Sequence, residues 1–149
     1  MLKLKKNQQG LAAIEMTLIL PIMLLLFFAT AEFGRLLYQY NALNKAVRDA
    51  SRYILANSEF NSTNLVAVTE QTRSAARSLL IYGDLNGTTA ILPNLAATTF
   101  SISVSGKFIT LTASYPWQPI FAETLPSFVS GNSFDLSFPL VTSYTMRAL

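Results

Sequence analysis

The sequence predicts an α+β fold, in which a long N-terminal membrane-spanning helix continues into a small head. Three observations predict it. The stretch 11–31 contains a single charged residue, and about 20 apolar residues are enough to cross the hydrocarbon core of a bilayer. Apolar residues then recur at every third or fourth position to about Ala56, as on one face of a helix. From Thr98 onward they alternate with polar residues instead, as in a strand, and this pattern predicts an antiparallel sheet of roughly three strands beside a second helix.

The composition restricts the functions that the chain can have. Its 149 residues are enough for one domain of ordinary size with a tail. The net charge of +3 comes from three lysines in residues 1–10, because the rest of the chain has eight basic and eight acidic residues. We therefore expect no nucleic-acid partner, since phosphate binding recruits a strongly basic surface.

The residue types that most catalysis and metal binding require are absent. The chain has no histidine and no cysteine, so it lacks the commonest general base and the commonest zinc ligands. Its carboxylates are scattered along the sequence, and a serine nucleophile would depend on Lys45 or Lys107 as its base. We expect no enzyme activity, no metal site and no cofactor.

One carboxylate needs an explanation, because Glu15 is the only charged residue between Lys6 and Glu32. A charged side chain at the centre of a bilayer costs about 2.5–3.5 kcal/mol on insertion scales, so such a residue usually has a function. Lys3, Lys5 and Lys6 precede the apolar run, and the positive-inside rule places that end of the chain in the cytoplasm.

Three interpretations of this segment remain open. It is an uncleaved signal anchor, a secretory signal cut after residues 29–31, or a precursor cut within Gly10–Glu15. The sequence Gly10–Glu15 resembles the processing site of type IV prepilins, in which a peptidase on the cytoplasmic face cuts after glycine. This resemblance implies a new N-terminus at Leu11. The new α-amino group would neutralise the Glu15 carboxylate of a neighbouring subunit and offset the cost of burying it.

The resemblance extends beyond the processing site. Residues 10–54, including Glu32–Leu37 and Ala46–Tyr53, are similar to the signature of TadE-like minor pilins of the tight-adherence (Tad/Flp) type IV pilus system. The C-terminal Tyr144–Arg147 also resembles the way such chains end. Met16 departs from the major Flp pilins, which usually have an aromatic residue there and are much shorter.

The resemblance implies a structural role. The chain would be a minor pilin that a prepilin peptidase processes and that initiates, caps or stabilises an adherence pilus. Its partners would be a major Flp pilin, a second minor pilin and an inner-membrane assembly platform. Before assembly it would lie in the bacterial inner membrane with its head in the periplasm, and afterwards in the pilus at the cell surface. Two alternatives are a pseudopilin of a secretion apparatus and a membrane-anchored adhesin that does not polymerise.

Three segments follow from this interpretation: a prepilin leader without regular structure (1–10), a membrane-spanning assembly helix (11–31) and a pilin-like head (32–149). We expect Pro21 to kink the helix, because proline has no N–H for the carbonyl of Thr17. The alternative is that a membrane helix simply tolerates the proline. The helix is expected to continue to about Ala56 with an apolar stripe on one side: Phe33, Leu36, Leu37, Tyr40, Leu43, Val47, Ala50 and Ile54.

Basic residues project from the opposite side of this helix. Lys45, Arg48 and Arg52 are either a solvated face or, for the two arginines, a contact with acidic groups of a neighbouring subunit. Asp49 is placed to pair with Lys45, four residues before it.

Capping and turn residues predict the other elements of the head. A second helix is expected to begin at a cap within Asn61–Asn64 and to end at Gly83. A hairpin is expected over about 98–115, with a tight connection at Gly106.

The C-terminal part of the sheet is less regular in sequence. Residues 125–133 are rich in proline, serine, glycine and asparagine, which predicts a loop. A third strand is expected over Phe134–Met146, with Pro139 at a bulge or an edge. Just before this part, Tyr115, Trp117 and Phe121 form an aromatic cluster that either caps the open end of the sheet or contacts another subunit.

Overall fold

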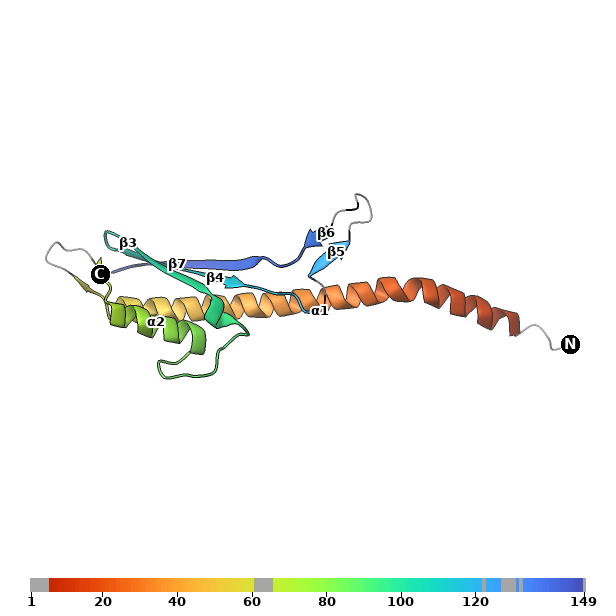
Figure 1. Ribbon diagram of the computed structural model, residues 1–149, viewed down its shortest axis with the longest axis horizontal. Coiled ribbons are helices and arrows are strands. Elements are labelled where there is room, and N and C mark those ends of the chain that lie inside the picture. Colours follow the sequence, from red (N-terminus) through yellow and green to blue (C-terminus); the bar gives the residue numbers. More distant parts are fainter. Residues whose placement is uncertain (1–5, 61–65, 122, 127–130, 132, 149) are drawn as a thin grey trace. The chain divides into compact units, whose positions relative to one another are not determined.

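Helix α1 (Lys6–Ala56) is the longest element of the computed structural model, which describes residues 6–60, 66–121, 123–126, 131 and 133–148. It passes through two compact units, which we call the stem (Met1–Arg35) and the head (Leu36–Leu149). Figure 1 shows α1 together with the other labelled elements, all of which belong to the head.

The stem consists of the N-terminal part of α1. The helix begins at Lys6, so the prediction that the leader lacks regular structure is wrong for residues 6–10. Gly10 is the only helix-weakening residue there, at a cost of about 1 kcal/mol, and the strongly helical run that follows offsets it. The hydroxyls of Thr17 and Thr30 donate to the carbonyls of Ala13 and Leu26 at 2.7 Å, so each finds a partner within the helix.

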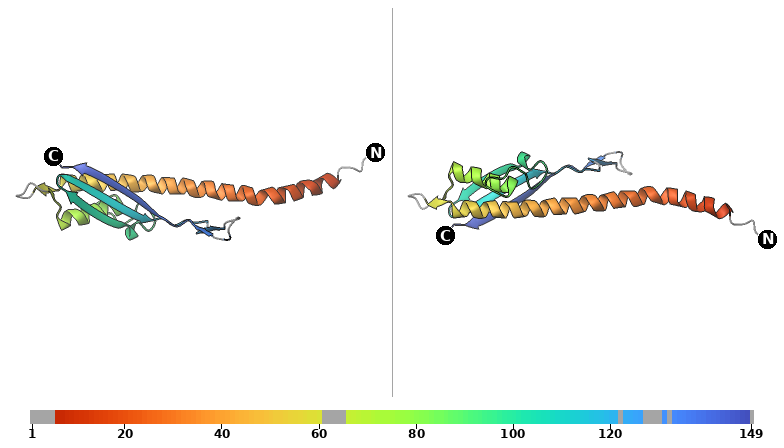
Figure 2. Two further views of the ribbon diagram at one scale, coloured as in Figure 1. Left: turned by 90° about the horizontal axis from the view of Figure 1, so that it is seen from above. Right: turned by 90° about the horizontal axis from the view of Figure 1, so that it is seen from below.

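The head is held together by one apolar core. Leu43, Val47, Ala50 and Ile54 of α1 are all 0% exposed. They belong to one cluster with the buried residues of the second helix and of the central strand: Ala76, Leu80, Ile81, Ile109, Leu111, Ala113 and Tyr115. Both helices lie on the same face of the sheet, as the two views of Figure 2 show. This two-layer arrangement confirms the predicted α+β class.

The buried stripe on α1 differs in phase from the prediction. Phe33, Leu37 and Tyr40 are 61%, 44% and 38% exposed, whereas Gln39 is only 4% exposed. Gln39 lies one turn before Leu43, on the same line down the helix, and its side-chain oxygen accepts a hydrogen bond of 3.5 Å from the hydroxyl of Tyr115. A polar residue therefore occupies a core position that a search for apolar periodicity misses.

Helix α2 (Glu70–Tyr82) ends as predicted and begins later than predicted. Thr69 is its N-cap and accepts from the amide of Thr72, so the expected cap within 61–64 is wrong; residues 61–65 themselves lie outside the described part of the chain. Gly83 has a φ of 72° and donates its amide to the carbonyl of Leu79 at 2.8 Å, a left-handed C-cap that favours glycine.

Two further short elements flank α2. Strands β1 (Glu59–Phe60) and β2 (Val66–Ala67) pair with each other before it, and β2 lies where the sequence predicted the start of this helix. A short 3-10 helix, η1 (Leu95–Ala97), follows it and leads into the sheet.

The sheet has the strand order β3-β4-β7, with both pairs antiparallel. Strands β3 (Thr99–Ser105) and β4 (Phe108–Pro116) confirm the predicted hairpin, and Gly106 has a φ of 60° in its tight turn. Strand β7 (Pro139–Arg147) pairs along the whole of β4, which places the two prolines at one end of the sheet as the pair Pro116↔Pro139.

The chain between β4 and β7 contains an additional strand pair. Strands β5 (Thr124–Pro126) and β6 (Ser133–Asp135) are antiparallel, so the prediction of a loop over 125–133 is wrong at its two ends. The third strand of the main sheet correspondingly begins at Pro139 and not at Phe134. Proline is suited to this first position, where it need not donate to a ladder.

Candidate assembly site

The predicted processing site lies on the exposed surface of the stem. Gly10 has no heavy atom within 4 Å of the position that a Cβ would take, and Leu11 is 70% exposed. Glu15 follows on the same helix and is exposed between apolar neighbours such as Ile14 and Met16. Among the described residues its carboxylate has no hydrogen bond and no ion pair. The stem therefore presents a charged group that its own chain does not neutralise.

Pro21 lies one and a half turns beyond Glu15, inside α1. Since proline has no N–H, the carbonyl of Thr17 lacks its usual helical donor. The helix nevertheless continues through this position without interruption, and Figure 1 shows it curving in its N-terminal part. The helix thus lacks one of its regular backbone hydrogen bonds close to Glu15.

The apolar side chains of the stem face outward. Within the described residues, the helix from Gly10 to Ala56 is long and apolar enough to cross a membrane, with a mean hydropathy of 2.4 over its most apolar 18 residues, none of which is buried by the protein itself. Length and composition suit a bilayer, in which an apolar surface does not need a protein partner.

Comparison with protein families identifies this segment. Residues 10–52 match the family model described as TadE-like protein. The chain carries a TadE-like domain. The matched residues are less than a third of the chain, namely the stem from Gly10 and the part of α1 in the head up to Arg52. The comparisons with curated proteins and with solved structures found no match. The TadE-like match and the long apolar helix both support a membrane-anchored protein associated with the Tad pilus.

Within the TadE-like domain, an ion pair marks the end of the apolar run, and sequence reasoning missed it. The Nε of Arg35 donates to a carboxylate oxygen of Glu32 at 3.0 Å, and its Nη2 contacts the same oxygen. The sequence contained enough information to predict this ion pair, because opposite charges three residues apart are neighbours on a helix. Pairing lowers the cost of holding both charges close to an apolar segment.

The arginines predicted to contact another subunit lie at the C-terminal end of the TadE-like domain. Arg48 and Arg52 line a shallow polar pocket of about 310 Å³, which we call the basic pocket. Lys45 and Asp49 line it as well, but they do not form the predicted ion pair, since no contact within 4 Å joins them. The complete lining is Asn41, Asn44, Lys45, Arg48, Asp49 and Arg52.

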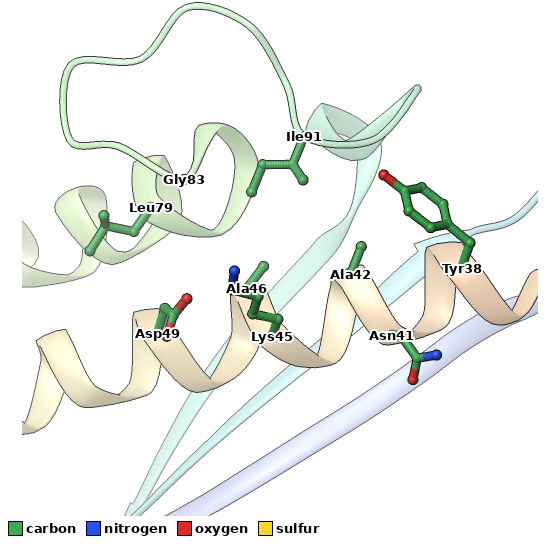
Figure 3. A pocket seen from close by; sticks show the side chains of 9 residues that line it. All are labelled: Tyr38, Asn41, Ala42, Lys45, Ala46, Asp49, Leu79, Gly83 and Ile91. Atoms are coloured by element: carbon green, nitrogen blue, oxygen red, sulfur yellow. The ribbon is translucent and has the colours of Figure 1, made fainter.

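A second pocket, of about 490 Å³, adjoins the basic pocket and shares three of its residues. Its floor is apolar: Ala42 and Ala46 of α1 face Ile91, which points toward them from the loop after α2 (Figure 3). Both pockets lie wholly within the head. The remaining lining residues are Tyr38, Asn41, Lys45, Asp49, Leu79 and Gly83.

The predicted aromatic cluster does not form one surface. Tyr115 and Trp117 are each 3% exposed; the Tyr115 hydroxyl donates to the carbonyl of Pro93 at 2.8 Å, and the Trp117 ring lies 5.2 Å from that of Phe138. Their role as an exposed subunit contact is therefore wrong, because both rings fill the core at the end of the sheet. Phe121, in contrast, is 53% exposed.

Proposed function

We propose that the chain is a minor pilin whose stem is both a membrane anchor and an assembly signal. A prepilin peptidase cuts between Gly10 and Leu11, and the mature protein is incorporated into a Tad/Flp adherence pilus, which it initiates, caps or stabilises. Before assembly the N-terminus faces the cytoplasm and the head lies in the periplasm. The major Flp pilin, a second minor pilin and an inner-membrane assembly platform are its proposed partners.

The unpartnered carboxylate of Glu15 is the observation that supports this proposal most. An ionised carboxylate in an apolar span is costly when it stands alone, and a cation brought by another helix removes most of that cost. Cleavage after Gly10 creates such a cation, because it exposes an α-amino group one turn before Glu15. When helices bundle, the amino group of one subunit neutralises the Glu15 of the next.

Pro21 gives the stem a second property that suits assembly. The missing hydrogen bond to Thr17 weakens the helix locally, and this allows the stem to bend or stretch on moving from the bilayer into a fibre. Bending at Pro21 would therefore occur when the stem leaves the bilayer and enters the fibre.

Mass spectrometry of sheared surface material tests the proposal, because it reports both where the protein is and where it begins. We expect the protein among the sheared pili with Leu11 as its first residue. A start at Met1 or at Glu32 would overturn the processing step. Recovery from the membrane alone, with Leu11 first, would favour a pseudopilin over a pilin.

Gly10→Val supplies a matched variant for the same measurement. Since the space around Gly10 is open, valine fits there without displacing any described atom, and the helix is retained. We expect the variant to stay in the membrane with Met1 as its first residue. A variant that is cut and assembled like the unaltered chain would show that cleavage does not depend on this glycine.

A further inference from the structure

Two asparagines of the chain stand in the sequence pattern at which oligosaccharides are attached to proteins. The pattern is an asparagine followed two positions later by serine or threonine, with any residue except proline between them. It occurs at Asn61–Thr63 and at Asn86–Thr88. In both places an acidic residue, Glu59 or Asp84, lies two positions before the asparagine, although only eight residues of the chain are acidic. Bacterial oligosaccharyltransferases select such an acidic residue, so both sequences match the narrower bacterial pattern.

The second of these sequences lies in an exposed turn of the head. Asp84–Thr88 directly follows Gly83, the C-cap of α2, and in Figure 1 the loop that contains it extends beyond α2 on the side away from the sheet. Four of its five residues are exposed, and Gly87 is half-buried. Residues 61–63 of the first sequence lie outside the described part of the chain, so the inference concerns Asn86 alone.

The backbone of this turn is held by contacts in which the Asn86 side chain takes no part. The amide of Asn86 donates to Oδ1 of Asp84 at 3.0 Å. Gly87 lies so close to the end of α2 that a Cβ there would be 2.6 Å from the Cβ of Tyr82, so only glycine fits at this middle position. Among the described residues, the carboxamide of Asn86 forms no hydrogen bond. Modification of this exposed side chain would therefore break no internal hydrogen bond.

We propose that Asn86 is an acceptor for N-linked glycosylation, with an oligosaccharide carried on a polyprenyl pyrophosphate as the donor. In this reaction the Nδ2 of Asn86 bonds to the anomeric carbon of the sugar. The bond between that carbon and the pyrophosphate oxygen breaks, polyprenyl pyrophosphate leaves with the electron pair, and a base of the transferase takes one proton from Nδ2. Asp84 and Thr88 are the side chains by which the transferase recognises the acceptor.

The inference rests on the topology proposed above, because bacterial oligosaccharyltransferases act on the periplasmic side of the inner membrane. It also restricts how the head is placed in an assembly. An attached oligosaccharide is bulky and hydrated, so the loop that carries Asn86 is not packed tightly against a neighbouring subunit. Contacts with other subunits are therefore expected on other faces of the head, and this loop is expected to face solvent in the pilus.

Mass spectrometry of the full-length protein, purified from the bacterium that produces it, tests the proposal. Trypsin separates the two sequences, because it yields Tyr53–Arg73 with Asn61 and Ser78–Lys107 with Asn86. We expect Ser78–Lys107 to carry an added oligosaccharide mass, which fragmentation of the peptide places on Asn86. Recovery of this peptide entirely without the added mass would overturn the proposal, and so would an added sugar located on a serine or threonine.

Single substitutions separate recognition of the sequence from folding of the head. Asn86→Gln should remove the added mass, and Thr88→Val should lower the modified fraction by about tenfold or more, because a site built to bind a hydroxyl rejects the analogue that lacks it. Asp84→Asn should lower it as well, since it keeps an oxygen that can accept from the Asn86 amide and removes only the charge.

Thr89→Ala is the matched control, because Thr89 is also exposed and lies next to the sequence but outside it. This variant should be modified like the unaltered chain. The fluorescence of Trp117 verifies that the head of each variant is folded. Full modification of the folded Thr88→Val protein would overturn the assignment, since the acceptor pattern requires the hydroxyl.

The glycosylation and the proposed function can fail independently. Protein that is found in pili with Leu11 first and with Asn86 unmodified leaves the minor-pilin role in place and removes the glycosylation. A modified Asn86 in protein that stays in the membrane with Met1 first keeps the glycosylation and the periplasmic head, and removes the processing step.

Discussion

The stem and the head use apolar residues in opposite ways. In the stem, Leu11, Ile14 and Leu18 are 60–70% exposed to the surroundings, whereas Leu43 and Val47 of the same helix are completely buried in the head. One continuous helix therefore meets two different environments. Helical periodicity alone therefore does not indicate what covers the apolar face of a helix. The core of the head covers the C-terminal part of α1, whereas the N-terminal part needs a bilayer or neighbouring helices to cover it.

The stem and the head also differ in whether their polar groups have hydrogen-bond partners within the chain. In the head, several buried polar side chains find partners within the chain, as when the Thr142 hydroxyl donates to the side-chain oxygen of Asn44, although the hydroxyl of Thr98 is buried without a hydrogen bond. Among the described residues of the stem, the Glu15 carboxylate has neither a hydrogen bond nor an ion pair. Because an unpaired charge in an apolar surrounding is costly, we expect the stem to depend on a partner more than the head does.

The largest effect is expected where the stem depends on a partner. Glu15→Ala and Glu15→Gln should reduce the protein in sheared pili at least tenfold, because neither side chain can pair with an α-amino group, while membrane insertion stays unchanged. Glu15→Asp keeps the charge and should retain part of the incorporation. Immunoblots of sheared and membrane fractions measure both quantities. Met16→Ala, at the adjacent exposed position, is the control, and a Glu15→Gln protein that assembles normally would contradict the role of the charge.

A pair of leucines on α1 tests the difference in packing. Leu43→Ala creates a cavity in the head core and should lower its free energy of unfolding by about 2–5 kcal/mol. Leu24→Ala, in the stem, should leave the head unchanged. The single tryptophan, Trp117, reports head unfolding alone, so its fluorescence during denaturation of the full chain in detergent compares the two variants. Equal losses would mean that the stem contributes to the folding of the head.

A smaller effect concerns the polar contact inside the head core. Tyr115→Phe removes the hydroxyl that donates to Pro93 and Gln39, and should cost about 1 kcal/mol in the same fluorescence measurement. Tyr144→Phe is the matched control, because the contact of Arg48 is with its ring. If the two variants lost equal stability, we would conclude that packing, and not the hydrogen bond with Tyr115, keeps Gln39 buried.

Much of the fold could be predicted from the sequence because local patterns determine it. The length of the apolar run, the period-2 alternation over the hairpin and the left-handed requirement at Gly83 and Gly106 each depend on nearby residues only. The end of α1 at Ala56 and the end of α2 at Tyr82 follow from the same kind of signal.

The missed features depend on residues that are far apart in the sequence. Gln39 is buried because Tyr115 meets it, and 76 positions separate the two. Strands β5 and β6 form in a segment with loop composition because each supplies the other with hydrogen bonds. The sequence left two roles open for Trp117, a cap on the end of the sheet and a contact with another subunit, because its packing against Phe138 joins distant parts of the chain. At the candidate site, the sequence identified Gly10, Glu15 and the arginines, whereas the pocket that Arg48 and Arg52 line could be found only in the structure.

The smallest expected effect concerns Asp135, a carboxylate of the head that, unlike Glu15 of the stem, has hydrogen-bond donors within its own chain. Asp135 accepts hydrogen bonds from the hydroxyl of Ser137 at 2.6 Å and from its amide at 2.8 Å, and these lower its pKa below the usual value of 3.8. A lowered pKa means that the two hydrogen bonds stabilise the folded pair of strands β5 and β6 above pH 3.8, and that this contribution is lost as the pH falls through the folded-state pKa. Ser137→Ala removes the larger cause, so the pKa of Asp135 should rise toward 3.8, as a carboxyl-carbon NMR titration would record. An unchanged titration in that variant would assign the lowered pKa to the backbone amide alone.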